Sequence, residues 1–234
     1  MKVDAKKMAA LIGVGQRIVF LTGAGVSTLS GIPDYRSATG LYTTSGLKEP
    51  EYLLSRQAML HDTDDFRRFI SQLCQKEAQP NVIHKKMAKL AKRKDVTVIT
   101  QNIDGLHSLA GSKKVIEFHG SLANSYCEKC RTIVETELFL KHATHPSCGG
   151  ILRPDVVLYD EQIPYENVEL SLKAMMHADV IVIVGTSFKV YPFASLIDYK
   201  NKDATILVVN KEPIYGAQPD WAFYGDGGEV FSLL

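Results

Sequence analysis

Short runs of β-branched and aliphatic residues alternate along the chain with segments whose apolar residues recur at helical spacing. Several runs are apolar at every position, which is typical of strands covered by helices on both faces of a parallel sheet. This alternation predicts an α/β fold, a Rossmann-like doubly wound parallel sheet. The predicted strands are 18–21, 96–99, 115–118, 180–184 and 205–209. The predicted helices include 4–13, 81–94 and 166–177.

Two stretches interrupt the alternation. Residues 38–79 are polar and mostly helical in pattern, and residues 124–151 hold three of the four cysteines. We expect both to be insertions that together form a smaller domain, from a helical insertion and a zinc-ribbon-like module. The Rossmann-like domain would then consist of residues 1–37, 80–123 and 152–234.

Composition narrows the possible functions. The chain has 234 residues, with 27 Lys and Arg against 26 Asp and Glu, so its net charge is +1. This balance argues against nucleic acid as a partner, because phosphate binding normally shows as a basic excess. The longest apolar run, Val180 to Val184, is too short to span a membrane, and the charged first residues do not form a signal peptide. We therefore expect a cytoplasmic protein without a membrane partner.

A glycine-containing loop follows the first predicted strand, with the sequence Thr22-Gly23-Ala24-Gly25-Val26-Ser27-Thr28. Glycines let a backbone approach a diphosphate closely, and the N-terminus of a following helix would favour its negative charge. The dinucleotide fingerprint G-x-G-x-x-G is incomplete, since Thr28 takes its third glycine position. No acidic residue stands about 20 positions further on to hold a ribose. Taken alone, the loop is also compatible with a tight turn that binds nothing.

Polar residues follow two other predicted strands. The segment Thr100 to His107 reads TQNIDGLH, and Phe118-His119-Gly120 follows the next strand. Open α/β sheets place their ligands at the carboxyl ends of parallel strands, so we expect these residues to share one crevice. A neutral imidazole there, that of His119, can act as a base. The turn Gly31 to Arg36 adds an acid, an aromatic ring and a guanidinium that can pair with a phosphate or with the acid.

Together these blocks resemble the sirtuins, the NAD-dependent protein-lysine deacylases. The resemblance also includes Leu152-Arg153-Pro154-Asp155-Val156-Val157 and Gly185-Thr186-Ser187, and it follows the family's order from about residue 8 to the end. It implies that the acyl oxygen of an acyl-lysine attacks the ribose carbon that carries nicotinamide. The implied products are nicotinamide, deacylated lysine and O-acyl-ADP-ribose.

The resemblance also implies roles for individual residues. His119 would be the general base, Asn102 would orient a ribose hydroxyl, and Ile103 with Asp104 would hold the nicotinamide carboxamide. Val156 and Val157 would pair with the substrate peptide by strand addition. The implied cofactor-binding residues are Gly23, Ala24, Gly25, Thr28, Asp34, Tyr35, Arg36, Gln101, Asn102, Ile103, Asp104, Gly185, Thr186, Ser187, Asn210, Lys211 and Gly227.

The chain departs from the family pattern in three places. Tyr35 stands where the family usually has Phe, and Leu158-Tyr159-Asp160-Glu161 replaces an aromatic-Phe-Gly-Glu run. Residues 38–60 lack the Tyr-x-x-Arg pair of members that are selective for acidic acyl chains, which favours acetyl or another neutral acyl group. We expect His107 to be structural rather than catalytic.

The cysteines resemble the family's zinc module. Cys127-x-x-Cys130 is followed by His145-Pro146-Ser147-Cys148, so His145 takes the third ligand position of a Cys₃His site. Such a closed site would be structural. His142 as the fourth ligand, a lost or weakly bound metal, and a Cys127–Cys130 disulfide are the alternatives. Cys74 reads as a small buried apolar residue.

Three other functions remain in view. Mono-ADP-ribosylation of a protein or simple NAD hydrolysis would use the same scaffold, although neither needs a base such as His119. A non-catalytic NAD sensor would use the same pocket. A dehydrogenase is the weakest candidate, because the third glycine and the ribose-binding acid are missing. We expect acyl-lysine proteins as substrates and a monomeric chain.

Overall fold

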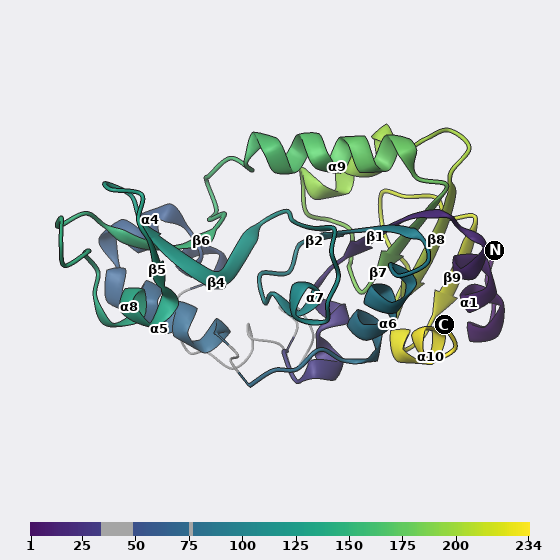
Figure 1. Cartoon of the computed structure of the whole chain (residues 1–234), viewed down its shortest axis with the longest axis horizontal. Helices are drawn as coiled ribbons and strands as arrows, with labels where there is room; N and C mark the ends of the chain where they lie inside the picture. Colours follow the sequence, from purple (N-terminus) through teal and green to yellow (C-terminus); the bar gives the residue numbers. More distant parts are fainter. Residues whose placement is uncertain (34–48, 75–76) are drawn as a thin grey trace.

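The computed structural model describes residues 1–33, 49–74 and 77–234. Its largest element is a sheet of six strands, all parallel (Figure 1). The order across the sheet is β3 (Val115–Glu117), β2 (Asp95–Thr100), β1 (Arg17–Thr22), β7 (Val180–Val184), β8 (Thr205–Asn210) and β9 (Trp221–Tyr224). The chain starts in the middle, runs to one edge and then returns to fill the other half. This is the strand order of the doubly wound Rossmann fold, which confirms the predicted fold class.

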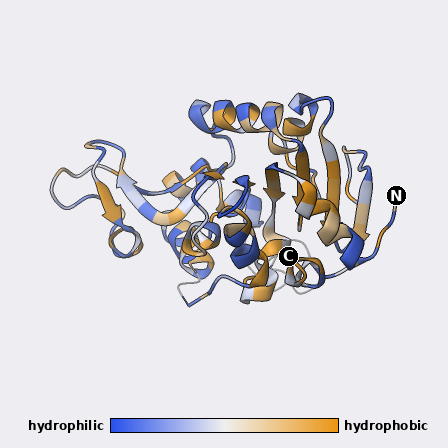
Figure 2. Cartoon of the chain, turned by 45° about the vertical axis from the view of Figure 1, so that its right-hand side comes forward, coloured by the Kyte–Doolittle hydropathy of each residue, from blue (hydrophilic) through white to orange (hydrophobic). Residues whose placement is uncertain are grey.

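Alternation along β1 shows how the sheet is covered. Ile18 and Phe20 face a core shared with α1 (Ala5–Val14), α6 (Val82–Leu90) and α10 (Gly227–Ser232). Val19 and Leu21 face a second core with α9 (Tyr165–His177) and the 3₁₀ helix η3 (Phe193–Tyr199). In Figure 1, α9 runs along one side of the sheet and α6 and α10 lie on the other. Figure 2 shows the apolar strands between these helices, as expected for a sheet buried on both faces.

A second, antiparallel sheet lies at the opposite end of the molecule from the N-terminus (Figure 1). Its order is β5 (Ile133–Glu135), β4 (Gly120–Cys127) and β6 (Leu152–Val156). This sheet packs with four helices from two separate segments, α3 (Pro50–Leu53), α4 (Arg56–His61), α5 (Thr63–Leu73) and α8 (Thr136–Lys141). Their core is separate from the two cores of the large sheet and includes Phe66 and Phe139, whose rings meet edge to face at 6.2 Å.

The five predicted strands are all present in the large sheet. Its sixth strand, β9, was not predicted, and neither were the strands of the small sheet. The helix predicted over 81–94 ends at Leu90, and residues 91–93 form turns that lead into β2. Cys74 follows α5 and packs partly buried against the core of the small sheet. Among the described residues, no helix is long and apolar enough to cross a membrane.

Candidate active site

A cavity of about 1400 Å³ lies at the carboxyl ends of β1, β2, β7 and β8 and reaches the loop after β6. Most of the residues singled out from the sequence line it, whereas Asp104 does not. Asp34, Tyr35 and Arg36 lie outside the described residues. The predicted residues that line the cavity are Gly23, Ala24, Gly25, Thr28, Gln101, Asn102, Ile103, His119, Val156, Val157, Gly185, Thr186, Ser187, Asn210, Lys211 and Gly227.

Two glycines bring the loops after β1 and β7 into direct contact. The N–H of Gly25 donates to the carbonyl of Gly185 at 2.8 Å, and a Cβ on Gly25 would lie 2.8 Å from the Cα of Gly185. Gly185 has φ +60°. No side chain fits between the two backbones, so both positions require glycine. The two loops meet where the strand order reverses, which is where doubly wound sheets bind their ligands.

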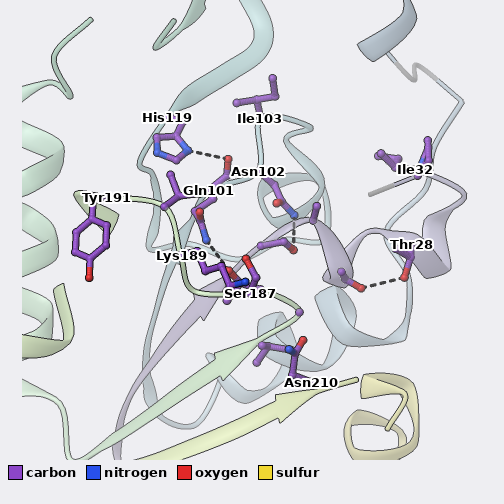
Figure 3. A pocket seen from close by; sticks show the side chains of 18 of the residues that line it. Thr28, Ile32, Gln101, Asn102, Ile103, His119, Ser187, Lys189, Tyr191 and Asn210 are labelled. Carbon is purple, nitrogen blue, oxygen red and sulfur yellow. Dashed lines mark hydrogen bonds between the residues drawn. The ribbon is translucent and has the colours of Figure 1, made fainter. Parts of the chain in front are cut away.

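The loop after β1 differs from the expected strand-to-helix turn. In the described residues it continues as two 3₁₀ helices, η1 (Ala24–Val26) and η2 (Thr28–Ser30), rather than as an α-helix. The hydroxyl of Thr28 donates back to the carbonyl of Gly25 at 3.0 Å (Figure 3). The Asn81 side chain at the start of α6 donates to the carbonyl of Val26 at 2.8 Å. The loop is therefore held by neighbouring polar groups.

Asn102 has a fixed orientation in the cavity wall. Its Nδ2 donates to the carbonyl of Gly23 and to the hydroxyl oxygen of Ser27, both at 3.1 Å (Figure 3). A backbone carbonyl can only accept, so the amide nitrogen must face Gly23. The amide oxygen of Asn102 has no partner within the described part of the chain. The site therefore presents a hydrogen-bond acceptor at this position.

A hydrogen-bond chain from Asp104 through Ser27 holds the amide of Asn102 in place. The role of Ser27 was not predicted from the sequence. The Ser27 hydroxyl donates to Asp104 Oδ2 at 2.6 Å, so its oxygen is left to accept from Asn102. Asp104 Oδ1 accepts the N–H of Leu106 at 2.9 Å, at the start of α7 (Leu106–Leu109). Both carboxylate oxygens of Asp104 are thus bound within the protein. The sequence signal for Ser27 was its place inside the glycine loop.

His119 lies at the end of β3 with one ring nitrogen committed. Its Nδ1 lies 3.2 Å from the carbonyl of Gln101, which can only accept, so Nδ1 carries the hydrogen (Figure 3). Nε2 is then the nitrogen with a free lone pair. Burial lowers the pKa of His119 below the ordinary histidine value, and the bond to Gln101 offsets part of that effect. The ring is therefore neutral at pH 7.

Two further histidines are buried beneath the site. His107 Nε2 lies 3.0 Å from the hydroxyl of Thr22, and the rings of His84 and His107 meet edge to face at 4.7 Å. Burial lowers the pKa of His107 to about 3 and that of His84 to about 4. Neither residue lines the cavity. This arrangement agrees with the structural reading of His107, while the sequence signal for His84 was its capping-box spacing to Asn81.

The loop after β6 forms the cavity wall next to His119. The N–H of Val157 donates to the carbonyl of His119 at 2.8 Å, so this loop is tied directly to the residue that carries the imidazole. Asp160 has φ +72°, a conformation that glycine adopts readily and that aspartate tolerates better than most residues. Asp160 therefore accommodates the turn although the family pattern has Gly at that position.

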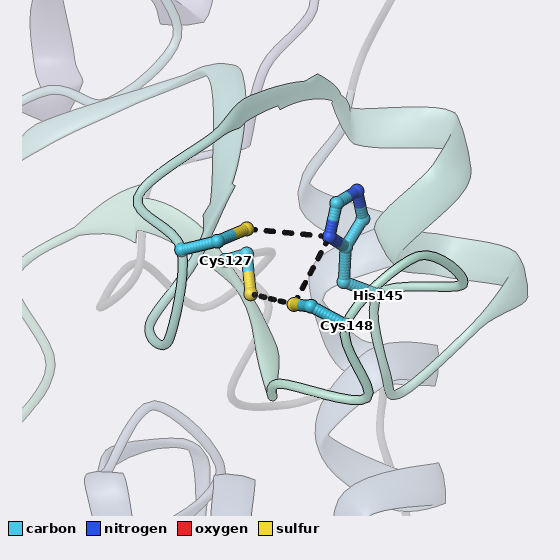
Figure 4. A group of neighbouring side chains, drawn as sticks. Cys127, His145 and Cys148 are labelled. Carbon is cyan, nitrogen blue, oxygen red and sulfur yellow. Dashed lines mark hydrogen bonds between the residues drawn. The ribbon is translucent and has the colours of Figure 1, made fainter.

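Three cysteines and one histidine meet near the turn between β4 and β5 (Figure 4). The ligand atoms of Cys127, Cys130, His145 and Cys148 all lie within 4.8 Å of one another. His145 Nδ1 is 3.3 Å from the sulfur atoms of Cys130 and Cys148, and the sulfur atoms of Cys127 and Cys148 are 3.5 Å apart. His142 is not part of this cluster.

The Cys/His cluster fits a structural zinc. Zn–S and Zn–N bonds of about 2.3 and 2.0 Å place the ligand atoms of a tetrahedral site about 3.5–3.8 Å apart, close to the distances found here. Cys127, Cys130 and Cys148 form no disulfide, and the 3.5 Å between the sulfur atoms of Cys127 and Cys148 is far longer than a disulfide bond of about 2.05 Å. Four protein ligands would leave zinc no open position for a substrate.

The cavity also fits a dinucleotide. Its volume exceeds the roughly 300–1,000 Å³ of ordinary small-molecule pockets. The segment Gly23 to Thr28 carries no acidic side chain that would repel a diphosphate. Asn102 adds an acceptor for a ribose hydroxyl, and the Asn210 side chain stands at the end of β8, where its Nδ2 donates to the carbonyl of Glu212 at 2.8 Å.

Comparison with solved structures finds close matches to this arrangement. A Sir2 homologue in complex with NAD is 33% identical, with a TM-score of 0.85 over 97% of this chain and 91% of that one. A Sir2 protein with a deacetylated peptide and 3′-O-acetyl ADP ribose is 29% identical, with a TM-score of 0.87 over 99% of this chain and 97% of that one.

Sequence comparison gives the same result. A NAD-dependent protein deacetylase of Listeria monocytogenes is 51% identical over 229 residues, which are 97% of this chain and 99% of that protein. One of Enterococcus faecalis is 45% identical over 94% of this chain and 92% of that protein. The model of the Sir2 family matches residues 23–192. The chain therefore belongs to the Sir2 family.

Proposed function

We propose that this chain is a NAD-dependent protein-lysine deacetylase. The observation that carries the proposal is the neutral, oriented imidazole of His119 in a cavity that fits a dinucleotide, within a Sir2 chain. Its relatives named NAD-dependent protein deacetylase match almost their full length, which supports the same reaction here. Transfer of ADP-ribose to protein and NAD hydrolysis find no separate support in the site.

The site residues would divide the chemistry between them. Bound NAD would supply the ribose carbon that the acyl oxygen attacks, with nicotinamide as the leaving group, and a ribose hydroxyl that receives the acyl group, while water completes the release of the lysine amine. His119 Nε2 takes the proton of a ribose hydroxyl, a contribution of roughly a hundredfold to ten-thousandfold. The amide oxygen of Asn102 accepts a hydrogen bond from a ribose hydroxyl and orients it. Because Asn102 is uncharged, it orients the hydroxyl without neutralising the positive charge that develops on the ribose.

The substrate peptide would lie along the loop after β6. Val156 and Val157 line the cavity next to His119, so a strand added there would bring an acyl-lysine toward the base. We extend the proposal to a neutral acyl group such as acetyl. In its support, Leu54, Ile103 and Leu158 give this part of the wall an apolar character.

Further parts of the proposal concern the whole protein. The separate cores support two domains, for which we propose a Rossmann-like domain of residues 1–37, 80–123 and 152–234 and a small domain of 38–79 and 124–151. Leu122 and strand β6 pack in the small core although they lie inside the first set of ranges. Free cysteines arranged as metal ligands suit a reducing compartment, so we propose a cytoplasmic protein.

Mass spectrometry tests the reaction. The purified chain is incubated with an acetyl-lysine peptide, with and without NAD. We expect deacetylated peptide, nicotinamide and O-acetyl-ADP-ribose to appear only with NAD, and the His119→Ala variant to form little of them. Nicotinamide release from an unchanged peptide would instead indicate ADP-ribosyl transfer or NAD hydrolysis. Binding of NAD without conversion of NAD or of the peptide would indicate a non-catalytic NAD sensor.

A further inference from the structure

Four charged side chains from separate segments meet beside the peptide-side wall of the cavity. Arg153 on β6 reaches both carboxylate oxygens of Glu161, at 2.5 and 2.7 Å. Arg56 on α4 reaches both oxygens of Glu128, at 2.6 and 3.2 Å. Cross contacts of 3.3 Å (Arg56–Glu161) and 3.5 Å (Arg153–Glu128) join the two bidentate pairs. We call these four residues the charged cluster.

The charged cluster is neutral overall and is most buried at its inner pair. The side chain of Arg153 is 6% exposed and that of Glu161 17%, against 25% for Glu128 and 37% for Arg56. A guanidinium as buried as that of Arg153 is stable only when its charge is balanced. Fixed bidentate geometry also makes such a pair more specific in orientation than a surface ion pair.

The inner pair, Arg153 and Glu161, binds two backbone groups at the end of β6 and in the loop that follows it. Arg153 Nη2 donates to the carbonyl of Val156 at 2.8 Å, and Glu161 Oε2 accepts the N–H of Leu158 at 3.0 Å. Between them, the N–H of Val157 donates to the carbonyl of His119. Three consecutive residues of the cavity wall are thus fixed, two by the charged cluster and one by the residue that carries the imidazole.

The outer pair, Arg56 and Glu128, connects this loop with two other segments. The N–H of Arg56 donates to the carbonyl of Tyr159 at 3.3 Å, and the N–H of Tyr159 donates to the carbonyl of Leu54 at 2.9 Å. Glu128 stands between Cys127 and Cys130, and its N–H donates to the carbonyl of Ile151 at 2.9 Å. The turn that supplies two cysteines of the Cys/His cluster therefore also supplies a charge that braces the loop.

We propose that the charged cluster positions the backbone of Val156 to Leu158 for pairing with the acyl-lysine peptide. Glu161 and Arg153 act directly on this segment, and Glu128 with Arg56 acts through them. All four are positioning residues, and none needs to touch the reacting atoms. The inference rests on the proposed function and deepens it, because it assigns peptide affinity to groups that stand apart from the glycine loop.

The test separates peptide binding from dinucleotide binding. The variants Glu161→Gln and Glu128→Gln remove one charge each at constant size. For Glu161→Gln we expect the KM for an acetyl-lysine peptide, and its Kd measured by fluorescence anisotropy, to rise about tenfold or more. A smaller rise is expected for Glu128→Gln. The Kd for ADP-ribose, measured by calorimetry, should stay within about twofold of wild type in both variants.

Two further variants keep the test informative. The double variant Arg153→Met/Glu161→Gln leaves no unbalanced buried charge, so the chain should fold. It also removes the Arg153 donor to the carbonyl of Val156, so the peptide Kd should stay above the wild-type value. Asp95→Asn is the matched control, since it breaks the exposed 2.6 Å pair with Lys114 at the far end of β2 and should leave both affinities unchanged.

The possible outcomes distinguish the two proposals. Wild-type peptide affinity in both Glu161 variants would overturn the positioning role, and so would an equal loss of peptide and ADP-ribose binding. A wild-type chain that binds and deacetylates the peptide keeps the proposed function whatever the variants do. A wild-type chain that binds no acetyl-lysine peptide would contradict the proposed function and this inference together.

Discussion

The Gln101 carbonyl determines which nitrogen of His119 can act as a base. It accepts the hydrogen from Nδ1, and the lone pair is left on Nε2. Burial, the larger effect on the ring, disfavours the charged form. Orientation and protonation state thus arise from separate contacts within the chain.

This arrangement predicts the pH dependence of turnover. The pKa of His119 lies below the ordinary value of about 6.5, so the active neutral form should predominate above that pH. We expect kcat/KM for the acetyl-lysine peptide to rise with pH along a single acid limb centred below 6.5 and to be level at pH 7. A limb centred near pH 7.5 would show that another group, or a raised imidazole pKa, controls the reaction.

Gly120 provides a second prediction for a single residue. It has φ +78°, and a Cβ there would lie 2.2 Å from the carbonyl oxygen of Asp155 on the neighbouring strand. Gly120→Ala should therefore push β4 away from β6 directly after His119, and lower the free energy of unfolding by more than about 1 kcal/mol. Urea denaturation measures this loss. Gly111→Ala, also at positive φ but with no atom within 4 Å, is the control for backbone strain alone.

At the scale of elements, the Cys/His cluster forms where two turns of the small sheet converge, one after β4 and one before β6. Its helices and strands are too brief to be stable alone, since β5 has three residues and α8 has six. A bound metal would join the turn after β4 to the turn before β6 and add folding free energy to this part of the chain.

His145 and His142 are a matched pair for testing the metal site. His145→Ala should lower the zinc content of the purified chain after dialysis against a chelator and lower the unfolding temperature. His142→Ala should do neither, because His142 lies outside the cluster. Zinc is measured by elemental analysis of the dialysed protein. Equal metal loss in both variants would place His142 among the ligands instead.

The elements that could be predicted from the sequence are those whose signal is local. β7 is apolar at all five positions, and the polar residues at the ends of β2 and β3 mark the crevice. By contrast β4 contains Gly120, Ser121, Asn124 and Ser125, so it lacks a strand-like apolar pattern. β9 has only two buried residues. Long-range bonds left no sequence signal either, as between Ser27 and Asp104, which are 77 positions apart.

Across the whole molecule, the charged cluster links the small sheet, α4 and the cavity wall. The hydrogen bond from Arg56 lowers the pKa of Glu128. For Glu161, burial alone would raise the pKa, but its bonds with Arg153 and the N–H of Leu158 outweigh burial and lower it. Both carboxylates are therefore ionised at neutral pH, and their pairing contributes to the stability of the chain.

This cluster predicts how stability depends on pH. A carboxylate with a lowered folded-state pKa contributes fully above its unfolded pKa of about 4.3, and the contribution is lost as pH falls through the folded value. Glu161→Gln should be less stable than wild type by about 3 kcal/mol at pH 7, because it leaves Arg153 poorly balanced. The difference should narrow below about pH 4.3. Denaturant unfolding at a series of pH values measures it, and a constant difference would contradict the assignment.

The bond between the N–H of Val157 and the carbonyl of His119 has a consequence for the choice of substrate. With a peptide paired along Val156 and Val157, its main chain and His119, the proposed base, are anchored to the same hydrogen bond. The distance between them then cannot adjust to a shorter side chain. Acetyl-ornithine, which lacks one methylene group of lysine, would fall short by more than 1 Å, a misplacement that costs about a hundredfold in rate. Selection against shorter side chains thus follows from the length of lysine, in addition to the apolar wall that Leu54, Ile103 and Leu158 provide.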